Sequence, residues 1–111
     1  MNTCKPTLLF DQDLFCIAQC PHCQRVGLTF KNILLGFDHS EFVELCRNIG
    51  QVNFDQCGML MPDGQLHMII NTSHPDVQFS LSRIEFDLFQ AGLSKALRLL
   101  GLYDLLKIQS N

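Results

Sequence analysis

Residues 33–42 read ILLGFDHSEF, and 44 positions later residues 77–86 repeat the pattern as VQFSLSRIEF. In both segments apolar residues alternate over five positions, which is typical of a strand with one buried face. A capping residue follows, Asp38 in the first segment and Ser82 in the second, each with a glutamate three residues later. This is the spacing of a capping box, in which two side chains bond free N–H groups at a helix start. Each segment therefore predicts a strand that leads directly into a helix.

Two amphipathic helices are expected after these caps, because apolar residues recur at helical spacing. The apolar stripe of the first helix stops at Gly50 and comprises Phe42, Leu45, Cys46 and Ile49. The stripe of the second helix stops at Gly101, which predicts a break, and comprises Ile84, Leu88, Ala91, Leu97 and Leu100.

A β-hairpin is expected before each of the two strand–helix segments. Residues 62–64, Pro-Asp-Gly, form a turn signal between two apolar runs. At the same offset of 44 positions, a turn falls near Ala18 to Cys20, between an incoming strand at 14–17 and an alternating strand at 26–30. The sequence therefore predicts an α+β fold, with an antiparallel sheet of five to six strands and two main helices on one face. We expect a single domain over residues 1–111, with a pseudo-repeat of two hairpin–strand–helix units at 14–50 and 57–100.

The composition is that of an ordinary globular domain, with 47% hydrophobic and 17% charged residues among 111. The net charge is −3 and the eight basic residues are scattered, which argues against nucleic acid or an anionic membrane as the main partner. No apolar run approaches the roughly 20 residues that span a bilayer. The first residues lack the basic start and apolar stretch of a signal peptide, so we expect a cytoplasmic protein. In that compartment, cysteines indicate metal binding, catalysis or burial before structural disulfides.

The strongest chemical signal is the motif Cys20-Pro21-His22-Cys23 at the first predicted turn. Two thiolates at this spacing occupy one side of a tetrahedral zinc ion, and a hairpin turn is the usual setting of a zinc knuckle. The sequence therefore predicts zinc as a cofactor with Cys20 and Cys23 as ligands. The candidates for the remaining ligands are Cys4, Cys16 and Cys57, with His22, His39, His67 and His74 in reserve. Cys46 is expected to pack in the core as a small hydrophobe.

A redox interpretation competes with the metal. Cys-Pro-His-Cys resembles the active-site tetrapeptide of thiol-disulfide oxidants with the thioredoxin fold. That resemblance implies Cys20 as the nucleophile and Cys23 as the resolving thiol, with Pro75 in place of the family's cis-proline. It also implies a helix that starts at the motif, where the helix dipole lowers the pKa of the first thiol. The residues that follow, QRVGLTF at 24–30, favour a strand instead. A plain turn without chemistry is the third interpretation.

The chain is also similar to an uncharacterised family of small bacterial domains that carry a CxxC near the start. The shared features are the CxxC, an alternating strand and a helix that opens polar-x-x-Glu, which together cover Cys20 to about Leu45. The resemblance implies a bacterial cytoplasmic domain and no known activity.

The C-terminal stretch predicts a contact with a partner. Its apolar residues spread around most of a helix and include Leu93, Ala96, Leu97, Leu99, Leu100, Leu102, Tyr103, Leu105, Leu106 and Ile108. A helix that is apolar on several sides needs more than one covering surface, and a homodimer or another protein supplies the second. The expected function is a non-enzymatic interaction module with a zinc-knuckle-like CxxC. The alternatives are a thiol-disulfide oxidoreductase that uses Cys20 and Cys23, and a metal-free interaction domain.

Overall fold

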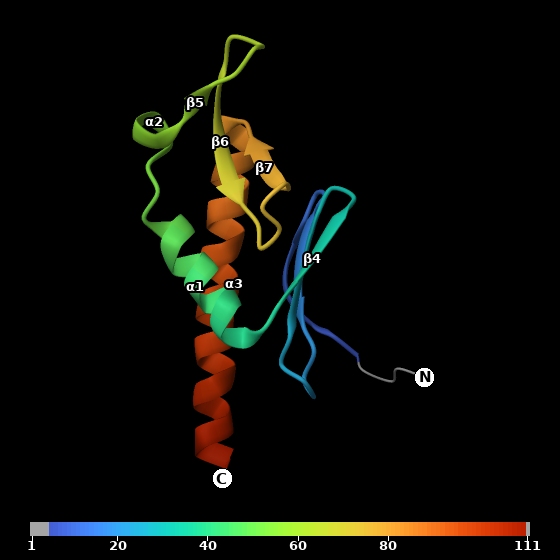
Figure 1. The fold of residues 1–111 in the computed structure, drawn as a ribbon. Helices are drawn as coiled ribbons and strands as arrows, with labels where there is room; N and C mark the ends of the chain where they lie inside the picture. Colours follow the sequence, from blue (N-terminus) through green and yellow to red (C-terminus); the bar gives the residue numbers. More distant parts are fainter. Residues whose placement is uncertain (1–4, 111) are drawn as a thin grey trace.

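The computed structural model describes residues 5–110, with side chains described as far as Leu102. The α+β class is confirmed, and the chain alternates between short antiparallel strands and helices (Figure 1). The elements in chain order are β1 (Thr7–Gln12), β2 (Phe15–Gln19), β3 (Val26–Phe30), β4 (Ile33–Phe37), α1 (His39–Gly50), α2 (Phe54–Cys57), β5 (Met59–Leu60), β6 (Leu66–Asn71), β7 (Gln78–Leu81) and α3 (Arg83–Ser110).

The strands form two sheets, so the prediction of one sheet with five to six strands is wrong. β1 to β4 make a four-stranded antiparallel meander in sequence order, and β5 to β7 make a separate three-stranded meander. The sheets meet through side chains, since the rings of Phe30 in β3 and Phe79 in β7 lie 5.8 Å apart. Each half of the chain still follows the order hairpin, strand, helix, as β2–β3, β4, α1 and as β5–β6, β7, α3.

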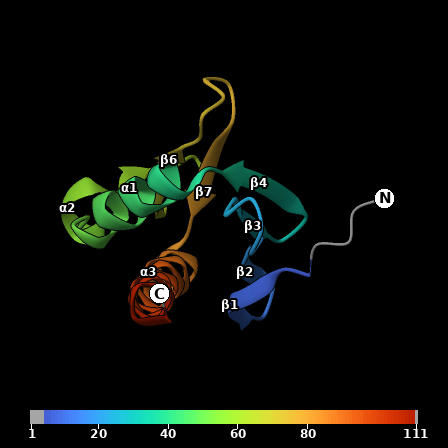
Figure 2. The ribbon, with the colours of Figure 1, turned by 90° about the horizontal axis from the view of Figure 1, so that it is seen from below.

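α3 is the central element of the core, because α1 and strands of both sheets pack against it (Figure 2). The ring of Phe89 in α3 is fully buried. It stacks on Phe15 of β2 at 5.1 Å and meets Phe30 and Phe79 at 6.0 and 5.8 Å. One aromatic residue of α3 thus contacts rings from both sheets and joins them to the same helix.

Both predicted helix starts are confirmed. Asp38 caps α1 and accepts from the Glu41 N–H at 2.8 Å, while the Glu41 side chain accepts from the Asp38 N–H at 2.9 Å. Ser82 and Glu85 make the same reciprocal pair at α3, at 3.3 and 2.9 Å. These boxes satisfy N–H groups that have no partner inside a helix, which fixes where each strand ends.

The apolar stripe predicted for α1 is confirmed, whereas that of α3 is confirmed at Leu100 and, with partial burial, at Leu88 and Leu97, but not at its start. Phe42, Cys46 and Ile49 are buried in α1, which ends at Gly50. In α3 the predicted Ile84 is 83% exposed and Ala91 also faces solvent. Besides the predicted Leu100, the buried apolar positions of α3 are Phe86, Phe89, Leu93 and Ala96. The larger rings take the core side, which rotates the helix away from the predicted face.

Gly101 does not break α3, which continues as one helix to Ser110. A single glycine in a helix interior is less favourable than alanine by about 1 kcal/mol, too little to end a long helix. At 28 residues, α3 is about 42 Å long. Within the described residues, no helix is both long and apolar enough to cross a membrane.

Candidate functional site

The CxxC motif lies in the turn between β2 and β3, as predicted. The backbone N–H of Cys20 donates to the Arg25 carbonyl and that of Gln24 to the Cys20 carbonyl, both at 2.9 Å. Gln24 adopts the left-handed conformation, with φ of 61°, that reverses the chain. The N–H of Cys23 points at the Cys20 sulfur across 3.5 Å. The motif is therefore an ordered turn whose two cysteine residues lie together.

The chain leaves this turn as strand β3, so the helix that the thioredoxin-like interpretation requires at the motif is absent from residues 20–30. No peptide bond in the described chain is cis, which removes Pro75 as a counterpart of that family's cis-proline. Cys20 is disulfide-bonded and Cys23 is a free, exposed thiol, so the two cysteines of the motif are not joined to each other.

The other predicted ligands do not converge on the motif. Cys16 lies in β2, four extended residues before Cys20, a separation of about 13 Å. Two sulfurs on one zinc ion lie less than about 5 Å apart, so Cys16 is too distant. Its thiol is half-buried, and burial, with a smaller contribution from the Asp11 charge, raises its pKa.

Cys57 ends α2, at the opposite end of the molecule from the β2–β3 turn (Figure 1). Cys4 lies outside the described residues. Cys46 is buried in the core as predicted, and burial raises the pKa of its thiol to about 12. Among the described residues, no group of three or more histidine, cysteine, aspartate or glutamate side chains could hold a metal ion. Because Cys20 is disulfide-bonded in this structure, zinc binding by Cys20 and Cys23 stays a prediction for the reduced chain.

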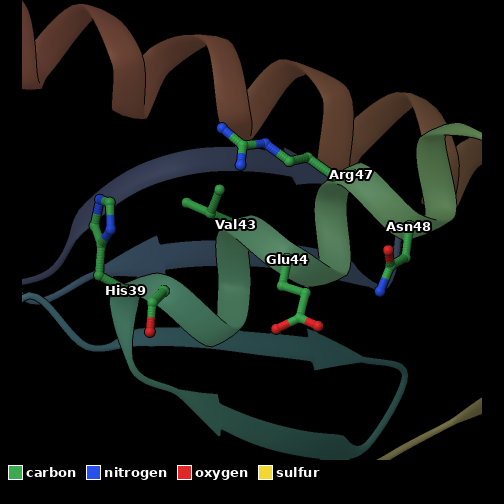
Figure 3. Close-up of a pocket in the computed structure, with 6 residues that line it drawn as sticks. His39, Val43, Glu44, Arg47 and Asn48 are labelled. Atoms are coloured by element: carbon green, nitrogen blue, oxygen red, sulfur yellow. The ribbon is translucent and has the colours of Figure 1, made fainter.

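A shallow hollow of about 480 Å³ lies on α1 and is lined by His39, Ser40, Val43, Glu44, Arg47 and Asn48. Figure 3 shows that its charged side chains diverge. His39 and Arg47 extend on the side that faces α3, with Val43 between them, whereas Glu44 points the opposite way. An imidazole, a carboxylate and a guanidinium that do not converge cannot act on one ligand atom, so the hollow is not a catalytic arrangement.

A second polar cluster lies on the outer face of the three-stranded sheet. The Ser80 hydroxyl in β7 is 3.1 Å from Nδ1 of His67 in β6, and Nε2 of His67 is 2.9 Å from a carboxylate oxygen of Asp63. Asp63 belongs to the predicted Pro-Asp-Gly turn, where its other oxygen accepts from the Gln65 N–H at 2.9 Å. That hydrogen bond, followed by the one to His67, lowers the pKa of Asp63. The three side chains form one continuous hydrogen-bonded chain.

The sequence indicated His67 only as a reserve zinc ligand and assigned no role to Ser80. The two residues are 13 positions apart, and their contact depends on the β6–β7 register, in which Ile69 pairs with Ser80. His67 is then the diagonal neighbour of Ser80 on the same face. The alternation of side chains along a strand places both residues on the outer face, so the sequence lacked only the β6–β7 register that brings them into contact.

Comparisons with known proteins give no relative for this chain. No family model matches it, and neither a curated protein nor a solved structure is similar to it at a significant level. Its function is therefore argued from its own geometry.

Proposed function

We propose that this domain is an interaction module that associates through the C-terminal part of α3, and that the partner is a second copy of the chain. The observation that carries the proposal is the extension of α3 beyond the rest of the fold. Figure 1 shows its C-terminal turns continuing past both α1 and the β2–β3 turn.

The dimensions of the molecule support this extension. The chain measures 53 × 31 × 26 Å along its principal axes, with a radius of gyration of 15.1 Å. A compact domain of this length has a radius of gyration of about 13 Å. α3 accounts for the excess, since a helix of about 42 Å exceeds both shorter dimensions of the molecule.

Leu102, the last residue whose side chain is described, is an exposed apolar residue on the face of α3 opposite to Leu100. Leu100 is 2% exposed, whereas Leu102 is 49% exposed. The sequence after Leu102 continues with Tyr, Leu, Leu and Ile among residues 103–108. A helical segment with this many apolar residues is unfavourable when it is exposed to water, because helices in proteins gain most of their stability from the packing of their apolar side chains.

A second copy is the favoured partner because each chain presents the same segment. Two identical apolar helix ends can pair about a two-fold axis, so that each covers the other. The segment beyond Leu100 has ten helical residues, about 15 Å in length. A contact of this size is smaller than the roughly 800 Å² per partner of a stable complex, so we expect the dimer to dissociate on dilution.

Sedimentation velocity over a range of concentrations tests the proposal. The full chain should shift from its monomer mass of 12.6 kDa towards twice that mass as its concentration rises. A chain that ends at Leu102 should remain monomeric with the same melting behaviour. Leu102→Glu should weaken the dimer, whereas Ser94→Glu, at an exposed position on the same helix, should not. A wild-type monomer at every concentration would reject the proposal.

A further inference from the structure

The hydrogen-bonded chain of Ser80, His67 and Asp63 has a defined direction. The low pKa of Asp63 keeps it a carboxylate, which accepts hydrogen bonds and cannot donate them. Nε2 of His67 therefore carries the proton that bonds Asp63 at 2.9 Å. In the neutral imidazole Nδ1 is then the acceptor, and the Ser80 hydroxyl donates to it across 3.1 Å. This is the order nucleophile, base, orienting carboxylate that activates a serine.

The exposure of the three side chains fits those roles. The His67 side chain is only 18% exposed, whereas that of Asp63 is 51% exposed. Ser80 faces solvent on the outer surface of β7. A shielded base beside an accessible hydroxyl allows a substrate to reach the nucleophile while the imidazole stays in one orientation.

Apolar side chains lie beside the hydroxyl and the imidazole on the same face. Met59 is the cross-strand partner of His67 and is 56% exposed. Ile69 is the cross-strand partner of Ser80 and is half-buried. Since cross-strand partners project to the same side of a sheet, Ile69 provides an apolar surface next to Ser80, and Met59 provides one next to His67.

β7 ends the order of the three-stranded sheet, with β6 as its hydrogen-bonded neighbour. In an antiparallel strand, alternate backbone N–H groups point towards and away from the neighbouring strand. Either the N–H of Ser80 or those of Phe79 and Leu81 therefore point away from β6. Backbone N–H groups beside a nucleophile are the donors that stabilise an oxyanion.

We propose that Ser80, His67 and Asp63 form an acyl-transfer centre that hydrolyses esters with an apolar acyl group. The Ser80 oxygen attacks the ester carbonyl and its proton passes to Nδ1 of His67. The C–O bond to the alcohol then breaks, and the leaving alkoxide takes that proton. Water next attacks the acyl-serine, again losing a proton to His67, which returns it to Ser80 as the carboxylic acid leaves. No oxidant or cofactor enters this sequence.

The test uses the full-length protein with p-nitrophenyl butyrate as substrate and a fluorophosphonate as a covalent serine probe. Wild type should release p-nitrophenol above the buffer rate, and mass spectrometry should place the probe on Ser80. Ser80→Ala should lose at least tenfold of the protein-dependent rate and all of the labelling. His67→Gln should do the same, and Asp63→Asn should reduce the rate at least tenfold.

Two controls separate this centre from incidental reactivity. Ser73→Ala removes another exposed serine of the β6–β7 hairpin, and His74→Gln removes a nearby exposed imidazole. Both variants should keep the wild-type rate. If Ser80→Ala hydrolyses the ester as fast as wild type, or if the probe reacts elsewhere, the proposal is wrong. Because Ser80 is exposed, Ser80→Ala should fold like the wild type. Its rate and labelling therefore test the proposal even if His67→Gln proves unstable.

Discussion

Replacing Gly92 with alanine should destabilise the domain, although alanine is the better helix former. Gly92 lies in α3 where the helix crosses the four-stranded sheet, and a Cβ at this position would lie 2.5 Å from Phe15 and 2.9 Å from Phe10. Phe15 cannot move easily, because it is fully buried and stacked on Phe89 at 5.1 Å. Phe10 is only partly buried and has more room to move.

The magnitude follows from two opposing effects. Alanine gains about 1 kcal/mol over glycine in a helix interior. Forcing a methyl group into a packed core is unfavourable by about 1–3 kcal/mol, and the upper part of that range applies because two rings must move. We expect a net loss of about 1–2 kcal/mol in the free energy of unfolding, which lowers the melting temperature by roughly 4–16 °C in a domain of this size.

Gly101 provides the matched control on the same helix. A Cβ at Gly101 meets nothing within 4 Å, so in the dilute, monomeric chain Gly101→Ala should stabilise the domain by the helix term alone, about 1 kcal/mol. Urea denaturation of both variants, followed by far-UV circular dichroism, measures the difference. If Gly92→Ala is as stable as Gly101→Ala, the close packing of α3 on the four-stranded sheet is wrong.

Further predictions concern the thiols, acid and zinc. Under native conditions Cys23 should react rapidly with a thiol reagent and Cys46 only on unfolding, since burial raises the Cys46 pKa to about 12; equal rates would contradict the placement of Cys46 in the core. Hydrogen bonds lower the pKa values of Asp38 and Glu85 on folding. The stability that these two carboxylates add is therefore fully present above their pKa values in the unfolded chain, near 4, and is lost as the pH falls through their lower pKa values in the folded chain. The drop in melting temperature between pH 5 and pH 3 should shrink in the double variant Asp38→Asn, Glu85→Gln, and an unchanged drop would contradict this. The zinc hypothesis predicts one zinc ion per reduced chain and a lower melting temperature for Cys20→Ser. A reduced protein that contains no metal and melts at the same temperature with and without this substitution would reject the hypothesis.

Sequence reasoning succeeds here where the signal is local. The capping boxes at Asp38 and Ser82 need only side chains three residues apart, so the ends of β4 and β7 and the starts of both long helices are predicted correctly. The β2–β3 hairpin is likewise set by alternation on both sides of one turn. These features involve little interaction between distant parts of the chain.

The features that sequence reasoning missed depend on distant contacts. The strands divide into two sheets whose rings from β2, β3 and β7 meet on Phe89, and single-strand patterns carry no information on which strands pair or which rings meet. The orientation of α3 follows from the same packing. The distance from the motif to Cys57 and the contact between His67 and Ser80 are also set by tertiary arrangement and strand register.

The self-association of α3 is the central functional claim, and sedimentation velocity of the full chain beside the chain that ends at Leu102 tests it most directly. The account predicts a concentration-dependent shift from 12.6 kDa towards a dimer for the full chain and none for the shortened one. Equal, concentration-independent monomer masses for both chains would contradict it.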